Sequence, residues 1–230
     1  MVQTNEIISQ YNLESHVAYN SNSKNKSKLG WLDDTLNAWI EINKDLINHS
    51  PNDAAYLYDE QTNVSLLSSA AYKAGLLSLA EYSSLKSRDT TNREYKGRTD
   101  LYISEKNKGK KHAIIEAKQI FIGTKENIYE RIANTLVEES KSSKNSDLHI
   151  DKKISCVFVI PRFKKLKTAE ALSDKCKKII IDIGIHHGAV AWYTPKYNIS
   201  TGKNISRANE DNPYFFTGIF LILKPVKMQS

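Results

Sequence analysis

Cysteine is scarce in this chain, with Cys156 and Cys176 the two examples among 230 residues. They are far apart in the sequence and form no pair at the spacing that holds a metal ion. Reduced thiols are the simplest expectation, and they suit a cytoplasmic protein. The sequence therefore predicts no cysteine-based metal motif.

Long apolar runs are also missing. No run approaches the roughly 20 apolar residues of a membrane-spanning helix, and the N-terminus has no apolar core of a signal peptide. The chain has no Gly-x-x-x-x-Gly-Lys loop for binding nucleotide phosphates, and no serine or cysteine nucleophile with a partner histidine is visible. We therefore expect no membrane contact and no hydrolysis of nucleoside triphosphates within this chain.

The composition is that of an ordinary chain, 40% hydrophobic and 26% charged, which is enough for one sizeable core. Lysine and arginine (33) exceed aspartate and glutamate (26), which gives a net charge of +7. The excess lies in residues 116–230, which hold 19 basic and 12 acidic residues. A basic surface suits a polyanionic substrate such as nucleic acid, and it also suits plain solubility.

The most informative stretch is residues 96–118. Its polar linker, 105–111, predicts a turn between two antiparallel strands. With the turn centred on Lys108, paired residue numbers sum to 216 and Asp100 faces Glu116. Strand alternation then predicts one face with Leu101, Ile103, Ala113, Ile115 and Ala117, and another with Asp100, Tyr102, Ile114, Glu116 and Lys118. A slip of one residue would place charges among the apolar residues, so the pattern favours this register.

Two facing carboxylates repel each other, and a divalent cation removes that repulsion. Hard oxygen ligands favour Mg²⁺, for which Mn²⁺ can substitute. Such an ion polarises a phosphoryl oxygen and helps to deprotonate water. The ammonium of Lys118 is suited to orient that water or to stabilise charge on the phosphorus oxygens.

The segment Arg98-Thr99-Asp100-Leu101, followed by Ile114-Ile115-Glu116-Ala117-Lys118, resembles the D…(D/E)-x-K signature of the PD-(D/E)XK nuclease superfamily, the restriction-endonuclease-like phosphodiesterases. Thr99 stands where the name of the signature has proline. The resemblance implies an α/β fold with a restriction-endonuclease-like core, in which helices flank a central mixed sheet. It also implies that Asp100, Glu116 and the Ala117 carbonyl hold Mg²⁺ while Lys118 assists the attacking water.

The remaining elements follow from periodicity. Residues 1–30 have the composition of a flexible segment, with a short helix over 4–11, and residues 31–230 are expected to form a single domain. Helices are predicted over 31–47, from Asp59 to an end at Gly75, and over 76–86, 126–140 and 168–181. One strand is predicted to begin within 88–95. Three others are predicted over 154–160, over 189–193 and over 215–223, and Pro161 is expected to end the first of these three.

Glu60 is a further candidate ligand. Many members of the superfamily carry an extra carboxylate on the helix before the sheet, and residues 58–63 resemble the start of that helix. The alternative is that Asp59 and Glu60 are ordinary acidic residues in a first helical turn. Glu81 is a second candidate, with a place on a solvated helix as its alternative.

The densest basic cluster follows the buried strand at 154–160. Arg162, Lys164, Lys165 and Lys167 are expected to contact nucleic-acid phosphates, with Arg98 beside the motif, or else to form a solvated surface. His186 and His187 are expected to be structural and to lie in a turn.

The sequence thus predicts a metal-dependent nuclease, acting on DNA more than on RNA, in a setting of restriction or host defence. The alternatives are a nucleic-acid- or protein-binding module on the same scaffold that does not cleave, and a structural subunit. Association as a homodimer or with a protein partner is left open.

Overall fold

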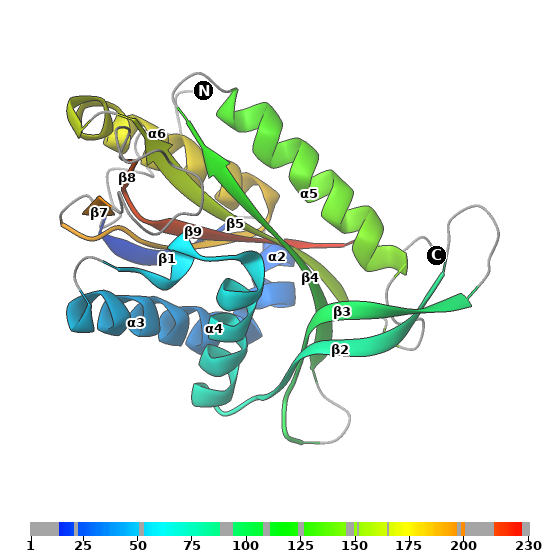
Figure 1. Cartoon of the computed structure of the whole chain (residues 1–230). Helices are drawn as coiled ribbons and strands as arrows, with labels where there is room; N and C mark the ends of the chain where they lie inside the picture. Colours follow the sequence, from blue (N-terminus) through cyan, green and yellow to red (C-terminus); the bar gives the residue numbers. More distant parts are fainter. Residues whose placement is uncertain are drawn as a thin grey trace.

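Five helices and nine strands make up the part of the chain that this computed structural model describes, which is residues 14–20, 23–50, 53–87, 94–107, 111–123, 127–145, 150, 152–164, 166–196, 199–200 and 214–226 (Figure 1). The helices are α2 (Ser23–Leu29), α3 (Asp33–His49), α4 (Glu60–Lys73), α5 (Ile128–Asn145) and α6 (Leu166–His187), with short 3₁₀ turns at Gly30–Leu32 and Ala55–Leu57. The strands are β1 (Ser15–Tyr19), β2 (Leu77–Ser87), β3 (Glu94–Ser104), β4 (His112–Ile122), β5 (Lys153–Phe163), β6 (Ala189–Tyr193), β7 (Ile199–Ser200), β8 (Phe215–Phe216) and β9 (Ile219–Pro225).

The strands form a mixed sheet in the order β1-β6-β9-β5-β4-β3-β2, with β7 and β8 paired beside β5. Strands β4 and β5 are parallel, and the other neighbours in this order are antiparallel. Parallel neighbours need a long crossover, which α5 supplies. The α/β class and the mixed central sheet predicted from the sequence are confirmed.

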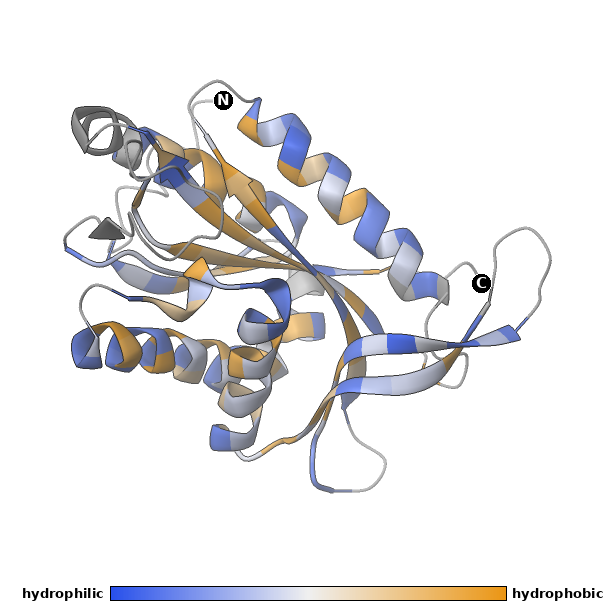
Figure 2. Cartoon of the chain, in the orientation of Figure 1, coloured by the Kyte–Doolittle hydropathy of each residue, from blue (hydrophilic) through white to orange (hydrophobic). Residues whose placement is uncertain are grey.

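Helices cover both faces of this sheet (Figure 1). Helices α3 and α4 pack on one face, where Trp39 and Leu67 join Ile115 and Phe158 in a core cluster. Helices α5 and α6 pack on the other face, where Ile132 and Ile180 meet Val157 and Phe220 in a second cluster. Figure 2 agrees with this division, because the inner strands are mostly hydrophobic, apart from hydrophilic residues in β4, while the helices are striped. Such strands are typical of a sheet covered on both sides.

The hairpin register predicted from the sequence is confirmed. The pairs are Leu101 with Ile115, Tyr102 with Ile114, Ile103 with Ala113 and Ser104 with His112. In each pair the residue numbers sum to 216, as the prediction requires. The apolar face predicted for these strands is buried in the cluster with α3 and α4.

Strand β2 replaces the helix predicted over 76–86. Leucine, alanine, glutamate and lysine favour a helix, but the segment pairs with β3 from Leu77 with Ser104 to Ser87 with Glu94. Pairing and packing decide strand formation more than intrinsic preference does. Glu81 has a φ of 55° within this strand, an uncommon conformation for a non-glycine residue.

Three further predictions differ from the structure. The segment 1–30 contains β1, which pairs with β6, and α2, so regular structure is present there. His186 and His187 end α6 instead of forming a turn. Strand β5 continues through Pro161 to Phe163, because Pro161 lies after the last β9 pair at Val159 and before the first β8 pair at Arg162. The helix predicted over 4–11 and the strand start within 88–93 lie outside the described residues.

The end of α4 agrees with its prediction. Gly75 has a φ of 83° just after the helix, and its N–H bonds to the Tyr72 carbonyl at 3.0 Å. The next N–H, of Leu76, reaches back to the Ala71 carbonyl at 3.0 Å. This pair of bonds is the Schellman arrangement that glycine favours, and it directs the chain into β2.

None of the helices in the described ranges has the length and apolar composition that crossing a bilayer requires.

Candidate active site

The candidate site lies where β3 separates from β4. The pairing of these strands ends at Leu101 with Ile115, whereas β4 stays paired with β5 as far as Ile122. Beyond Ile115 the outer edge of β4 therefore needs other hydrogen-bond acceptors. The Asp100 carboxylate accepts from the Ala117 N–H at 2.7 Å, and the Glu60 carboxylate accepts from the Gln119 N–H at 3.0 Å. Two acidic side chains thus replace the missing strand at this edge.

Glu60 reaches this edge because α4 begins beside it. Asp59 caps the helix by accepting from the Thr62 N–H at 2.8 Å, and its contacts with Thr62 lower the pKa of its carboxyl group. The Gln119 side chain fastens β4 to the same turn, since it donates to the Tyr58 carbonyl at 2.8 Å and accepts from the Asn63 amide at 2.6 Å. Asp59 is therefore a cap, and Glu60 is the acidic residue directed at the sheet.

Glu116 and Lys118 lie on the face of β4 that is covered by α5. Glu116 is buried, with 3% of its surface exposed. The Lys118 ammonium lies 3.4 Å from Glu60 Oε2, and half of its side chain is exposed. Asp100 is bonded at the same stretch of β4, so the structure brings together the four side chains that the sequence predicted.

Lys86 is an unpredicted member of the site. Its ammonium lies 3.0 Å from Glu116 Oε1, and its side chain is nearly buried, with 10% exposed. Lys86 belongs to β2, so its stem passes over Gly97 of β3 on the way. A Cβ atom at position 97 would lie 2.7 Å from Lys86 Cδ. Glycine at 97 thus leaves the space through which Lys86 reaches Glu116.

Glu139 of α5 is a second unpredicted member. Burial, together with the charges of Asp100, Glu116 and Glu60, raises the pKa of its carboxyl group to about 7, although Lys118 opposes the shift. These carboxylates therefore share one electrostatic environment. Burial, together with Asp100, Glu60 and Glu139, also raises the pKa of the Cys156 thiol, which makes this cysteine an inert core residue.

Glu81 also lies at the site, on the other side of Asp100. It falls between the pairs Ala80 with Leu101 and Tyr82 with Thr99, so its register position is opposite Asp100. Its Oε2 is 2.6 Å from Arg98 Nε, a close ion pair without the alignment of a hydrogen bond. Burial raises the pKa of Glu81, although Arg98 opposes the shift.

The donor set fits Mg²⁺ in kind, because carboxylates and a backbone carbonyl are the hard ligands that this ion prefers. In the present conformation, however, these donors do not form a metal-binding geometry among the described residues. Within the described part of the chain, no three histidine, cysteine, aspartate or glutamate side chains lie close enough together to hold an ion. Glu116 is also bound to Lys86 through Oε1. A cation that binds Glu116 through Oε1 would have to displace the Lys86 ammonium.

The basic residues predicted to contact nucleic acid lie in two places. Arg98 is at the site, but it pairs with Glu81, and its Nη1 is 3.0 Å from the Gln61 amide oxygen in the amide orientation that satisfies both groups. Arg162 stacks on Tyr214 and Phe121, 4.5 and 5.2 Å from the ring centres. Lys164 is exposed after β5, Lys165 lies outside the described residues, and Lys167 is in α6 with its side chain outside the description.

Arg162 is distant from the acidic residues. Lys118 pairs with Val157 on the neighbouring strand, and Arg162 follows five residues later, roughly 17 Å along the strand. The basic residues after β5 are thus at the carboxyl end of the parallel pair, beyond the candidate site.

The missed residues had weak signals in the sequence. The sequence predicts a helix over 76–86, which includes Lys86, and no sequence spacing indicates that Lys86 contacts Glu116. Glu139 is one of two adjacent glutamates in α5 and looks like a surface residue. A strand interpretation of 77–87 would have placed Ser84 and Lys86 on one face, which is the signal that was available.

Comparison of the chain with protein-family models, with curated proteins and with solved structures finds no match.

Proposed function

We propose that this protein is a metal-dependent nuclease that hydrolyses phosphodiester bonds, with DNA as its substrate. The observation that supports it best is the gathering of Asp100, Glu116, Glu60 and Lys118 within electrostatic reach of Glu139, where β3 leaves β4. Such a concentration of negative charge is costly to a fold unless cations offset it, and Lys86 and Lys118 offset part of it. It lies in a chain with a net charge of +7, which suits a polyanionic substrate.

In this proposal Asp100, Glu116 and the Ala117 carbonyl would hold Mg²⁺, with Glu60 as a further ligand, directly or through water. When bound, the ion would polarise a phosphoryl oxygen and lower the pKa of water. The Lys118 ammonium, which is half-exposed beside Glu60, binds a phosphate oxygen or orients the attacking water. Glu139, with a pKa of about 7, can take up a proton near neutral pH.

The proposal includes the finer fold. The order α4, β2, β3, β4, α5, β5 has a helix, an antiparallel set of strands, a crossover helix and a parallel strand. This order resembles the core of restriction-endonuclease-like enzymes, and the acidic residues lie at the corresponding hairpin. The strands and helices outside it would be elaborations.

A second function is favoured by one contact. Lys86 holds Glu116 Oε1 at 3.0 Å in a buried pair, and a lysine in that position can replace a cation permanently. The protein would then bind nucleic acid or a protein partner on this scaffold without cleaving it.

The test is incubation with circular single-stranded DNA, circular double-stranded DNA and RNA, in Mg²⁺, in Mn²⁺ and in EDTA. The matched variants are Asp100→Asn, which keeps an acceptor for the Ala117 N–H, and Asp45→Asn on the exposed surface of α3. We expect cleavage that needs the metal and is lost only in Asp100→Asn. Cleavage that persists in EDTA would refute the mechanism, and binding without cleavage under every condition would favour the second function.

A further inference from the structure

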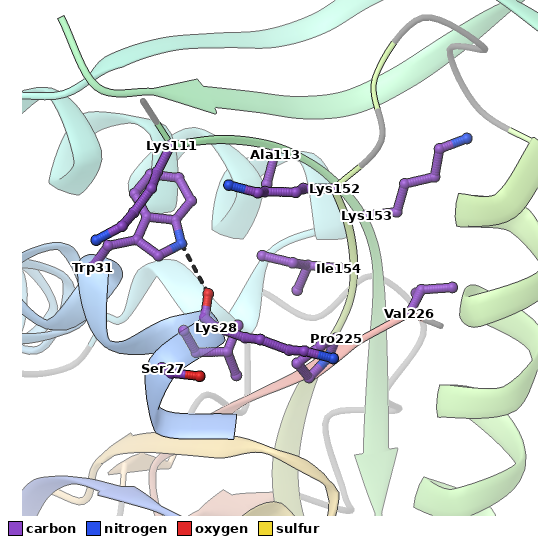
Figure 3. Close-up of a pocket in the computed structure, with 11 residues that line it drawn as sticks. Ser27, Lys28, Trp31, Lys111, Ala113, Lys152, Lys153, Ile154, Pro225 and Val226 are labelled. Carbon is purple, nitrogen blue, oxygen red and sulfur yellow. Dashed lines mark hydrogen bonds between the residues drawn. The ribbon is translucent and has the colours of Figure 1, made fainter. Parts of the chain in front are cut away.

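A basic pocket lies at the end of the sheet where β4 and β5 begin and β9 ends. Its volume is about 300 Å³. Trp31 lies on one side and Pro225 and Val226 on another, with Lys28, Lys152 and Ile154 between them (Figure 3). The pocket therefore joins flat and apolar walls to ammonium groups.

A second pocket of about 390 Å³ continues from the first, since both are lined by Lys28, Pro225 and Val226. It adds Lys144 and Lys224. No aspartate or glutamate lines either pocket among the described residues. Burial, with the nearby Lys144 ammonium, lowers the pKa of Lys224, so these two positive charges lie close together.

His187 gives an independent sign of a missing partner. It lines the second pocket, and its Nε2 is buried with no hydrogen-bond partner in the described part of the chain. Burial lowers the pKa of His187 to about 4, and Lys224 and His186 act in the same direction. At neutral pH the ring is neutral, and a buried nitrogen without a partner is unfavourable. An anion seated among the lysines would supply the missing negative charge.

Trp31 supplies a rigid flat surface. Its indole N–H donates to the Lys28 carbonyl at 3.0 Å (Figure 3), which fixes the ring against the lysine that both pockets share. Bases stack on such rings without sequence preference.

We propose that the joined pockets bind the phosphates and base of a nucleotide, either a free nucleoside polyphosphate or the end of a nucleic-acid strand. Several ammonium groups match a ligand with several negative charges better than a single phosphate ion. The apolar wall and Trp31 match a base. Ala113 at the pocket and Lys118 at the candidate active site are five residues apart, roughly 17 Å along β4, so this is a separate site. The proposal does not depend on nuclease activity.

The experiment measures tryptophan fluorescence during titration in EDTA, with ATP and with a short 5′-phosphorylated oligothymidylate as probes. Trp39 and Trp192 are fully buried, so Trp31 is the indole placed to respond. The test variant is Lys28→Gln with Lys224→Gln, and the matched control is Lys44→Gln with Lys73→Gln on exposed helix surfaces. Asp100→Asn reports any contribution of the candidate active site.

We expect quenching by one probe or both, and weakening of at least about tenfold in the pocket variant alone. Binding of ATP but not the oligonucleotide identifies a nucleotide site, and the reverse identifies a strand-end site. Quenching should disappear in Trp31→Phe. Failure of both probes to bind would overturn the proposal, as would equal weakening in the control pair or a loss of binding caused by Asp100→Asn.

Discussion

Replacing Lys86 tests the least expected contact in the candidate site. Lys86→Met keeps most of the stem that passes over Gly97 and removes the ammonium that lies 3.0 Å from Glu116 Oε1. Both partners are nearly inaccessible to water, so solvent can replace little of what is lost. Glu116 would then stay buried near Asp100, Glu60 and Glu139 without its cationic partner.

Breaking a buried pair by removing one member costs about 3–5 kcal/mol. A fold of this size has about 5–15 kcal/mol of unfolding free energy, so Lys86→Met should lower the denaturation midpoint strongly. Lys86→Met with Glu116→Gln should recover much of the loss, because the double variant buries no unpaired charge. Mg²⁺ should also stabilise Lys86→Met, by about 2.7 kcal/mol at one hundred times the Kd of the variant. The same Mg²⁺ concentration should stabilise the parent protein less, since the Lys86 ammonium competes for Glu116 Oε1.

Urea denaturation with and without Mg²⁺ measures the unfolding free energy of each variant and its stabilisation by the ion. Lys44→Met on the exposed face of α3 is the control. A Lys86→Met protein as stable as the control would show that the pair is unimportant. Additive losses in the double variant would show that the two side chains are not coupled. An equal response of both proteins to Mg²⁺ would refute competition between lysine and metal.

Three further outcomes are expected. Lys118→Ala should keep its fold and its metal affinity, because the side chain is half-exposed, and its cleavage rate should fall about 100-fold or more. Calorimetry measures the metal affinity and a nicking assay measures the cleavage rate. Full activity would remove Lys118 from the mechanism. Glu60→Gln should lower activity strongly with little change in Tm, since the amide oxygen still accepts from the Gln119 N–H; an active variant would reduce Glu60 to a helix-start residue. The raised pKa of Glu139, about 7, lies above its ordinary value of 4.5, so the folded state loses stability as pH rises from 4.5 to 7. Glu139→Gln should therefore stabilise the protein above pH 7, by about 1–2 kcal/mol after screening of its partly exposed carboxylate, and have no such effect below pH 4.5; a pH-independent difference in unfolding free energy would contradict this.

The hairpin of β3 and β4 was predictable because its sequence permits one register. Charges alternate with apolar residues on both strands, and a slip would place Asp100 or Glu116 among the apolar residues that face α3 and α4. The same alternation identified Asp100, Glu116 and Lys118 as neighbours. Glu60 was predictable for another reason. It is the first residue of the amphipathic helix α4, and its spacing from the apolar residues of that helix places it on the side that docks on the sheet.

Strand β2 was not predictable by the same means. Its residues have helical preferences, and Leu77 and Leu79 are half-exposed, so the apolar positions do not mark an inner face. The inner positions near the site are polar, with Ser84 and Thr99 hydrogen-bonded and Lys86 paired to Glu116. Periodicity finds a buried face only when that face is apolar. A strand that delivers a lysine to a buried carboxylate lacks this signal.

The place where β3 leaves β4 explains why the acidic residues gather there. Continued pairing would have given the Ala117 and Gln119 N–H groups to carbonyls of β3, and no side chain would have been needed. Separation of the strands leaves these two N–H groups to Asp100 and Glu60. Each bond fixes one oxygen of a carboxylate, and no hydrogen bond within the described residues reaches Asp100 Oδ1 or Glu60 Oε1. The backbone thus orients two carboxylates and leaves each with an oxygen to offer a cation, a preorganisation that depends on the strands parting at Ile115.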